Sequence, residues 1–145
     1  MVRLMRAVIK VLAVAPWTFY LTDSPRHLVA PLSDTPYCSK FIVDVCEDQR
    51  HVLVHTMARI CVAEEKRLDV GMFIHHVNAQ CVIGSFDFDI HEGWLAHRTG
   101  IDMRTTALTP DIMATVLADG LAAVETYIPI VEDIVSGRVT VVEAV

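Results

Sequence analysis

The feature that most constrains the fold of this chain is a change of hydrophobic period between residues 63 and 104. Apolar residues recur at helical spacing over residues 63–79, whereas apolar and polar residues alternate over residues 82–90, as in a half-buried strand. His91-Glu92-Gly93 then predicts a tight turn, and residues 94–102 a returning strand. Because a hairpin follows a helix directly, this segment favours an antiparallel sheet with a helix packed on it.

The predicted helix has an apolar stripe and the predicted strand an apolar face, and we expect both to contact the core. Asn78, near the end of the helix, is a residue type that tolerates the left-handed conformation found where helices end. The stripe consists of Leu68, Met72, Phe73 and Val77, and the strand face of Val82, Gly84, Phe86, Phe88 and Ile90.

Patterns of the same two kinds account for the rest of the chain. Thr109-Pro110-Asp111 predicts the start of the last helix, because threonine caps helices and proline suits the first turn. Pro129 is expected to bend or split this helix, and Gly137 to end it. Gly71 and Gly120, inside predicted helices, indicate close packing, more simply in the core than at a dimer contact. The other predicted elements are a helix over residues 2–14 and strands over residues 17–21, 27–32, 37–46 and 51–62.

The resulting order is α-β-β-β-β-α-β-β-α, which indicates an α+β fold with a mostly antiparallel sheet and helices packed on one face. Because the turns are short and no repeat appears, we expect a single domain over residues 1–145. Residues 1–15 superficially resemble a signal peptide, but Lys10 interrupts the apolar run. Arg3, Arg6 and Lys10 also share one helical face, so an amphipathic helix is favoured.

Composition predicts self-association and argues against two classes of partner. Hydrophobic residues make up 53% of the chain, above the ~45–50% typical of soluble domains, and a homodimer would bury the surplus. The net charge of −6 argues against nucleic-acid binding, and no segment has the ~18 uninterrupted apolar residues of a membrane span. The cysteines form no paired motif, which predicts reduced thiols and a cytoplasmic protein. They are Cys38, Cys46, Cys61 and Cys81.

The motifs that usually signal catalysis or metal binding are missing from the sequence. The seven histidines invite a metal hypothesis, but His51 and His55 would lie about 13 Å apart on one strand, too far for a shared zinc ion. There is no nucleophile elbow, phosphate-binding glycine loop or dinucleotide fingerprint. We therefore predict no catalytic residues, no cofactor and no metal site.

Acidic residues near the predicted hairpin receive the same interpretation. Asp87, Asp89, Glu92 and Gly93 have the composition of a calcium loop without the EF-hand spacing, so outward-facing strand acids are favoured. Asp44 lies in an apolar strand, where its pKa would be perturbed if it were buried, but a paired aspartate or one at a sheet edge is the simpler interpretation.

The sequence resembles the YbjN-like family over roughly residues 37–137. The resemblance is carried by E-E-K-R at 64–67, I-G-S-F-D-F-D at 83–89, W-L-A-H-R-T-G-I at 94–101, L-T-P-D-I at 108–112 and Y-I-P-I-V at 127–131. The family is described as bacterial regulators of sensory transduction, and its fold is similar to that of class I type III secretion chaperones. The resemblance implies a small dimeric α+β domain and carries over no catalytic residues.

Two hypotheses from different classes follow. The first is a non-enzymatic bacterial regulator or chaperone-like adaptor that forms a homodimer and binds an unidentified protein through an exposed apolar patch. The alternative is a small-molecule-binding or enzymatic domain with a pocket near residues 94–104. That pocket would require His97, Arg98, Asp102 and Arg104 to converge, whereas a solvated edge strand is the simpler interpretation of these four residues.

Overall fold

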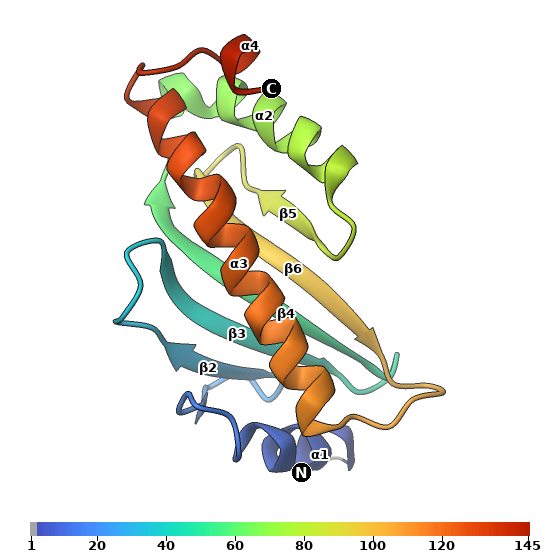
Figure 1. Ribbon diagram of the computed structural model, residues 1–145. Coiled ribbons are helices and arrows are strands. Elements are labelled where there is room, and N and C mark those ends of the chain that lie inside the picture. Colours follow the sequence, from blue (N-terminus) through green and yellow to red (C-terminus); the bar gives the residue numbers. More distant parts are fainter. Residues whose placement is uncertain (1–2) are drawn as a thin grey trace.

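The computed structural model describes residues 3–145, in which one long helix crosses a six-stranded sheet (Figure 1). The predicted order of elements is confirmed, with a short helical turn added after β4 and a short helix near the end. Residue 2, the predicted start of the first helix, lies outside the described residues. The elements are α1 (Arg3–Leu12), β1 (Tyr20–Leu21), β2 (His27–Pro31), β3 (Cys38–Cys46), β4 (His51–Cys61), η1 (Glu64–Lys66), α2 (Arg67–Gln80), β5 (Ser85–Phe88), β6 (Trp94–Asp102), α3 (Pro110–Val135) and α4 (Val141–Ala144).

The sheet is antiparallel throughout, in the order β1-β2-β3-β4-β6-β5. Its three long strands, β3, β4 and β6, lie in the middle. In β3 and β4 the predicted alternation is confirmed: Phe41, Val43 and Val54 are buried on the inner face, which α3 covers, whereas Ile42 and His55 are half-buried on the outer face. One apolar face per strand therefore specifies the register across the sheet centre.

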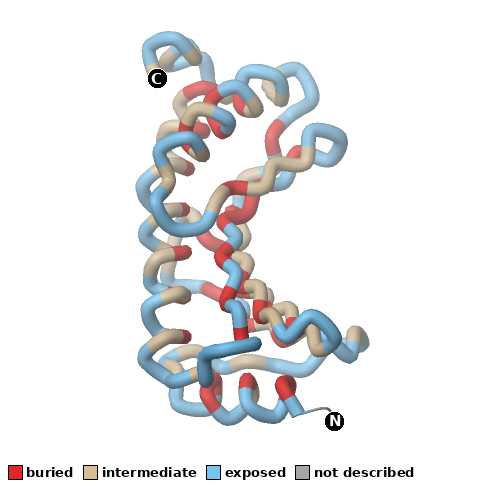
Figure 2. Tube along the Cα trace, turned by 90° about the vertical axis from the view of Figure 1, so that its right-hand side faces the viewer, coloured by how far each residue is buried: buried red, intermediate tan, exposed pale blue. Residues whose placement is uncertain are grey.

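Helix α3 covers the inner face of the sheet. Figure 2 shows its buried residues turned toward the strands and its exposed residues on the opposite side. The hydroxyl of Thr109 accepts a hydrogen bond from the backbone N–H of Ile112 at 3.2 Å, which confirms the predicted cap. The fully buried side chains include Met113, Leu117, Val124, Ile128 and Val131.

Of the two outcomes predicted for Pro129, a bend or a split, the split does not occur, because α3 continues to Val135 without interruption. Proline removes the hydrogen bond to the carbonyl four residues earlier. That carbonyl belongs to Glu125, which is exposed and can bond to water instead. Ile128 and Val131, on either side of Pro129, are fully buried and hold both halves against the sheet. By length and composition α3 is also apolar enough to cross a membrane, and here its buried residues, such as Leu117 and Val124, face the sheet.

Helix α2 presents a different face to the core from the one predicted. Phe73 and Val77 are buried as expected, but Leu68 is 73% and Met72 64% exposed. Val70 and Ile74 take the predicted core positions instead. The helix has apolar residues on two faces, so helical spacing alone does not determine which face packs inward.

The strand that follows α2 is shorter than predicted and its edge is closed by Asn78. Strand β5 spans only Ser85–Phe88, because Gly84 adopts a φ of +69° and Val82 before it is 97% exposed. Asn78 lies inside α2, so the prediction that it ends the helix is wrong. Its side-chain amide donates to the carbonyl of Phe86 at 3.0 Å and accepts from the N–H of Phe86 at 2.7 Å.

Helix α1 packs at the end of the molecule opposite to α2 and α4 (Figure 1). Its apolar side, which includes Val8 and Leu12, is buried, and Arg3, Arg6 and Lys10 are exposed as predicted. The carboxylate of Glu47, in the turn between β3 and β4, accepts a hydrogen bond from the N–H of Leu4 at 2.7 Å. This contact supplies the helix start with an acceptor and a favourable charge.

The segment after α1 is mostly a loop, although residues 17–21 were predicted to form a strand. Only Tyr20 and Leu21 pair with β2. Trp17 and Phe19 instead pack their rings on Phe41, with ring centroids 5.0 and 6.3 Å away. Aromatic packing on the core therefore takes the place of most of the predicted pairing.

The close approach of α3 to the sheet at Gly120 can be tested by adding one methyl group. In Gly120→Ala the new Cβ would overlap Thr56 Oγ1 and lie 3.2 Å from Thr56 Cβ. We expect the free energy of unfolding to fall by about 1–3 kcal/mol, although alanine favours helix by about 1 kcal/mol. Chemical denaturation measures this change. The added substitution Thr56→Ala should restore part of the loss, whereas a more stable Gly120→Ala protein would contradict the contact.

The two hydrogen bonds between Asn78 and Phe86, called here the Asn78 clamp, predict a second measurable loss of stability. Asn78→Leu removes both bonds to Phe86 and leaves a backbone donor and acceptor without partners beside α2. We expect a loss of about 1–3 kcal/mol in the free energy of unfolding and faster hydrogen exchange at the Phe86 amide. Gln80→Ala, at an exposed position of the same helix, is the matched control. Unchanged exchange at Phe86 would contradict the clamp.

Candidate functional site

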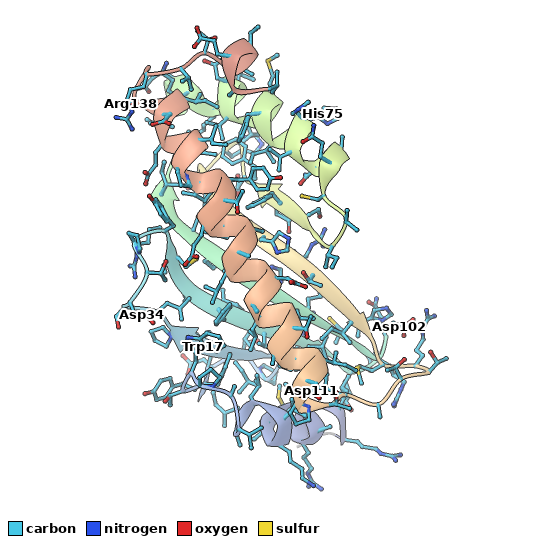
Figure 3. The ribbon with its side chains drawn as sticks, in the orientation of Figure 1. Trp17, Asp34, His75, Asp102, Asp111 and Arg138 are labelled. Atoms are coloured by element: carbon cyan, nitrogen blue, oxygen red, sulfur yellow. The ribbon has the colours of Figure 1, made fainter. Side chains whose placement is uncertain are left out.

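The four residues proposed to form a pocket along β6 do not converge. His97 is buried on the inner face, whereas Arg98 is exposed on the outer face and pairs with Asp87 at 3.1 Å. Asp102 and Arg104 pair with each other at 2.7 Å at the end of β6, where Figure 3 labels Asp102. The expectation of an edge strand is also wrong, because β6 lies between β4 and β5.

His97 belongs instead to a buried polar cluster beneath α3. Its Nε2 lies 3.2 Å from the carbonyl oxygen of Ile83. Because a carbonyl only accepts, Nε2 carries the proton and Nδ1 is unprotonated. Within residues 3–145, no hydrogen-bond partner is found for His97 Nδ1 or for the buried hydroxyls of Thr56 and Thr99. Gly120 of α3 closes the cluster from above, so these groups are enclosed and face no open cavity.

Burial also controls the protonation of two histidines. It lowers the pKa of His97, with the Ile83 carbonyl, Asp119 and Asp87 partly opposing the effect. On the outer face burial likewise lowers the pKa of His55, against the attraction of Asp87 and Asp44. Burial therefore favours the neutral form of both imidazoles.

Three of the acidic residues singled out in the sequence, Asp44, Asp87 and Asp89, have structural partners, and Asp89 lies with Glu92 in the turn after β5, not in a strand as predicted. Asp44 accepts two hydrogen bonds from Arg26, at 3.0 and 2.8 Å, which confirms that it is paired. Asp89 Oδ1 accepts from the N–H groups of His91 and Glu92, at 2.8 and 3.0 Å, and so shapes the hairpin turn. These bonds lower the pKa of Asp89.

Potential metal ligands are dispersed over the described part of the chain. Within residues 3–145, no three of the His, Cys, Asp and Glu side chains are grouped as a metal ion would require. The four cysteines are free thiols in different environments: Cys38 is buried, Cys46 and Cys81 are half-buried, and Cys61 is exposed. Burial raises the pKa of Cys38 to about 11, which keeps that thiol protonated.

One apolar surface is formed by α2 and its neighbours. We call it the α2 patch and define it by the exposed side chains Leu68, Met72, Ile90 and Val142. Hollows of about 440 Å³ and 420 Å³ lie on either side of Met72, one bordered by Ile90 and the other by Val142. Lys66 and Asp69, which carry opposite charges, lie at the border of the second hollow.

A second apolar surface lies at the other end of the molecule, between α1 and β1. We call it the α1–β1 groove; it encloses about 510 Å³. Tyr20 and Leu21 at its rim are 58% and 64% exposed. Trp17 at this end and His75 on α2 mark the two surfaces in Figure 3. The groove is lined chiefly by Ile9, Leu12, Ala13, Trp17, Phe19 and Leu28.

Sequence reasoning missed both surfaces, although each left a signal. The run Trp17-Thr18-Phe19-Tyr20-Leu21 carries more large apolar side chains than a two-residue edge strand can bury. In α2, the sequence contains two alternative apolar faces, one with Leu68 and Met72 and one with Val70 and Ile74. A helix with two apolar faces indicates two contacts, of which one is the core of its own chain.

Comparison with known proteins identifies a structural neighbour but no relative by sequence. No family model matches the chain, and no match is found among curated proteins. The crystal structure of YbjN from E. coli, described as a candidate transcription regulator, superimposes with a TM-score of 0.60 at 14% sequence identity. The superposition covers 81% of this chain and 83% of the YbjN chain. The chain therefore has a YbjN-like α+β fold.

The buried histidines predict that stability depends on pH. His97 and His55 bind protons more weakly when folded than when unfolded, so the unfolded state gains protons first as the pH falls. Stability should therefore be complete above the unfolded pKa of about 6.5 and should decrease as the pH falls from about 7 to about 5. Denaturant titrations at several pH values measure this slope.

Substitution of the two histidines separates their effect from that of the carboxylates. The slope should become smaller in His97→Gln and again in the double variant with His55→Gln. His75→Gln, at an exposed site, is the control and should leave the slope unchanged. An unaltered slope in the double variant would exclude these histidines as its origin.

Proposed function

We propose that this protein is a non-enzymatic regulatory adaptor that acts as a homodimer and binds a protein partner in the bacterial cytoplasm. The observation that carries this proposal is the presence of two exposed apolar surfaces at opposite ends of one small domain. Contiguous exposed apolar surface is typical of protein–protein contact sites. Two separated surfaces allow the molecule to bind a second copy at one end and a partner at the other.

The α2 patch is the better candidate for self-association. A two-fold dimer brings the same surface of each copy together, and an apolar surface is complementary to itself. Lys66 and Asp69 at the border carry opposite charges. In a two-fold dimer, Lys66 of each copy can therefore pair with Asp69 of the other copy. Exposed Leu68 and Met72 would supply the apolar centre of the contact and the charged pair its rim.

A regulatory role is supported by the YbjN-like fold, because YbjN is described as a candidate transcription regulator. The net charge of −6 disfavours contact with nucleic acid and favours regulation through another protein. Four free cysteines suit the reducing cytoplasm. The dispersed positions of His97, Arg98, Asp102 and Arg104 favour the adaptor over an enzyme with a pocket near residues 94–104.

Light scattering over a dilution series tests the dimer. We expect a species of about 32 kDa, twice the chain mass of 16.1 kDa. The double variant Leu68→Asp/Met72→Asp should be monomeric, because it would bury four carboxylates in the two-fold contact. The matched control Leu21→Asp alters a leucine of similar exposure at the opposite end and should stay dimeric. A wild-type monomer at every concentration, or a dimer that survives the double substitution, would contradict the proposal.

A further inference from the structure

The two edges of the sheet differ in whether their backbone groups are already bound. At one edge, the amide of Asn78 bonds to both the N–H and the C=O of Phe86 in β5. An edge closed in this way does not accept another strand. At the other edge, Tyr20 and Leu21 of β1 pair with β2 on one side, and within residues 3–145 no side chain bonds to their backbone. The β1 edge is therefore open to a further strand.

A groove suited to apolar side chains adjoins this open edge. The α1–β1 groove is bounded by Tyr20 and Leu21 themselves and reaches inward to Leu12 and Leu28, which are buried. A strand added beside β1 turns alternate side chains to opposite faces. One set of its side chains would thus enter the groove between α1 and the 13–19 loop, while its backbone bonded to β1. An open edge with an adjacent pocket is the arrangement used in peptide recognition by strand addition.

The charge around the groove indicates which kind of segment would bind. Residues 3–22 contain three basic residues and no acidic one, whereas the rest of the chain has nine basic and 18 acidic residues. Arg6 precedes the groove residue Ile9 by three positions in α1, and Lys10 precedes the groove residue Ala13, which directly follows α1, by three. Side chains at these spacings are neighbours on a helix surface. The groove is therefore bordered by positive charge in an otherwise acidic molecule.

We propose that the β1 edge and the α1–β1 groove bind an extended segment of a partner protein, in which large apolar side chains alternate with acidic ones. The segment adds a strand beside β1, its apolar side chains fill the groove, and its carboxylates approach Arg6 and Lys10. This inference rests on the proposed function in assuming that the partner is a protein. It goes further in assigning the binding site, the extended conformation and the charge of the segment.

Two other occupants fit the same surface less well. An anionic lipid surface would also attract the basic residues of α1, but the apolar side of α1 is already buried in the protein, and only Tyr20, Leu21 and Val14 remain exposed nearby. A second copy of the chain would meet the groove with an acidic surface, but the α2 patch already offers a self-complementary contact. Neither alternative makes use of the open backbone of β1.

The test uses the full chain and a defined ten-residue peptide in which Leu and Val alternate with Asp and Glu. Titration followed by amide chemical shifts locates the site, and we expect the changes at residues 17–21 and at Ile9 and Ala13. A peptide of the same sequence with alternate amides N-methylated loses its strand donors. It should bind more weakly than the unmodified peptide by a factor of about ten or more. A peptide with Lys in place of Asp and Glu should be weakened similarly at low salt.

Two variants, one in α1 and one in the turn that follows it, provide a matched pair. Ala13→Trp places a large ring over the groove and should weaken peptide binding about tenfold or more, because it excludes an apolar side chain. Ala7→Trp, equally exposed on α1 but outside the groove, should bind as the wild type does. Light scattering on both variants checks that the dimer is unaffected.

The other outcomes overturn the inference in different ways. Shift changes confined to the α2 patch would reject the β1 edge but leave protein binding intact. Equal binding of the N-methylated peptide, or of Ala13→Trp, would exclude strand addition into the groove. If no peptide binds while vesicles of anionic phospholipid shift the α1 resonances, the surface is a lipid contact and the partner segment is excluded. A monomer in light scattering, by contrast, bears only on the proposed dimer.

Discussion

The close contact between α3 and the inner face of the sheet is the constraint on which the rest of the structure depends. Gly120 lies directly over Thr56, where any larger residue would overlap the threonine hydroxyl. This contact sets the depth at which Leu117 and Val124 enter the core on either side. Because α3 crosses the middle of the inner face over β3, β4 and β6, α1 and α2 pack near its two ends (Figure 1). The two apolar surfaces of the molecule are therefore as far apart as the length of α3 allows.

Much of this fold could be predicted because its signals are local. The alternation in β3 and β4, the Thr109 cap and the turn at Gly93 each depend on residues close together in sequence. The predictions that were wrong concern features that depend on contacts between segments distant in the sequence. The choice of the Val70 and Ile74 face of α2 over the face with Leu68 and Met72 is made by the surface on which the helix packs. Sequence spacing does not contain that information.

The candidate surfaces were less accessible to prediction than the fold, for a related reason. An exposed apolar side chain and a buried one look alike in a sequence, and only packing distinguishes Leu21 from Leu28. Asn78 illustrates the same point for polar residues. Its type suggested the end of a helix, but its amide serves as a substitute for a neighbouring strand, eight residues along the chain at Phe86. In α2 the side chain of Asn78 thus provides partners for a strand edge that would otherwise lack them.

The position of α3 near the end of the order of elements has a consequence for synthesis of the protein. The sheet strands leave the ribosome first, and residues 38–102 can pair before residues 110–135 exist. Until then the part of the inner face with Val43 and Val54 lacks the helix that covers it. Contacts between segments so far apart in sequence form slowly, and uncovered strands associate readily. A nascent chain of this protein therefore passes through a stage in which it requires protection from other chains, and that stage ends only when its longest helix is complete.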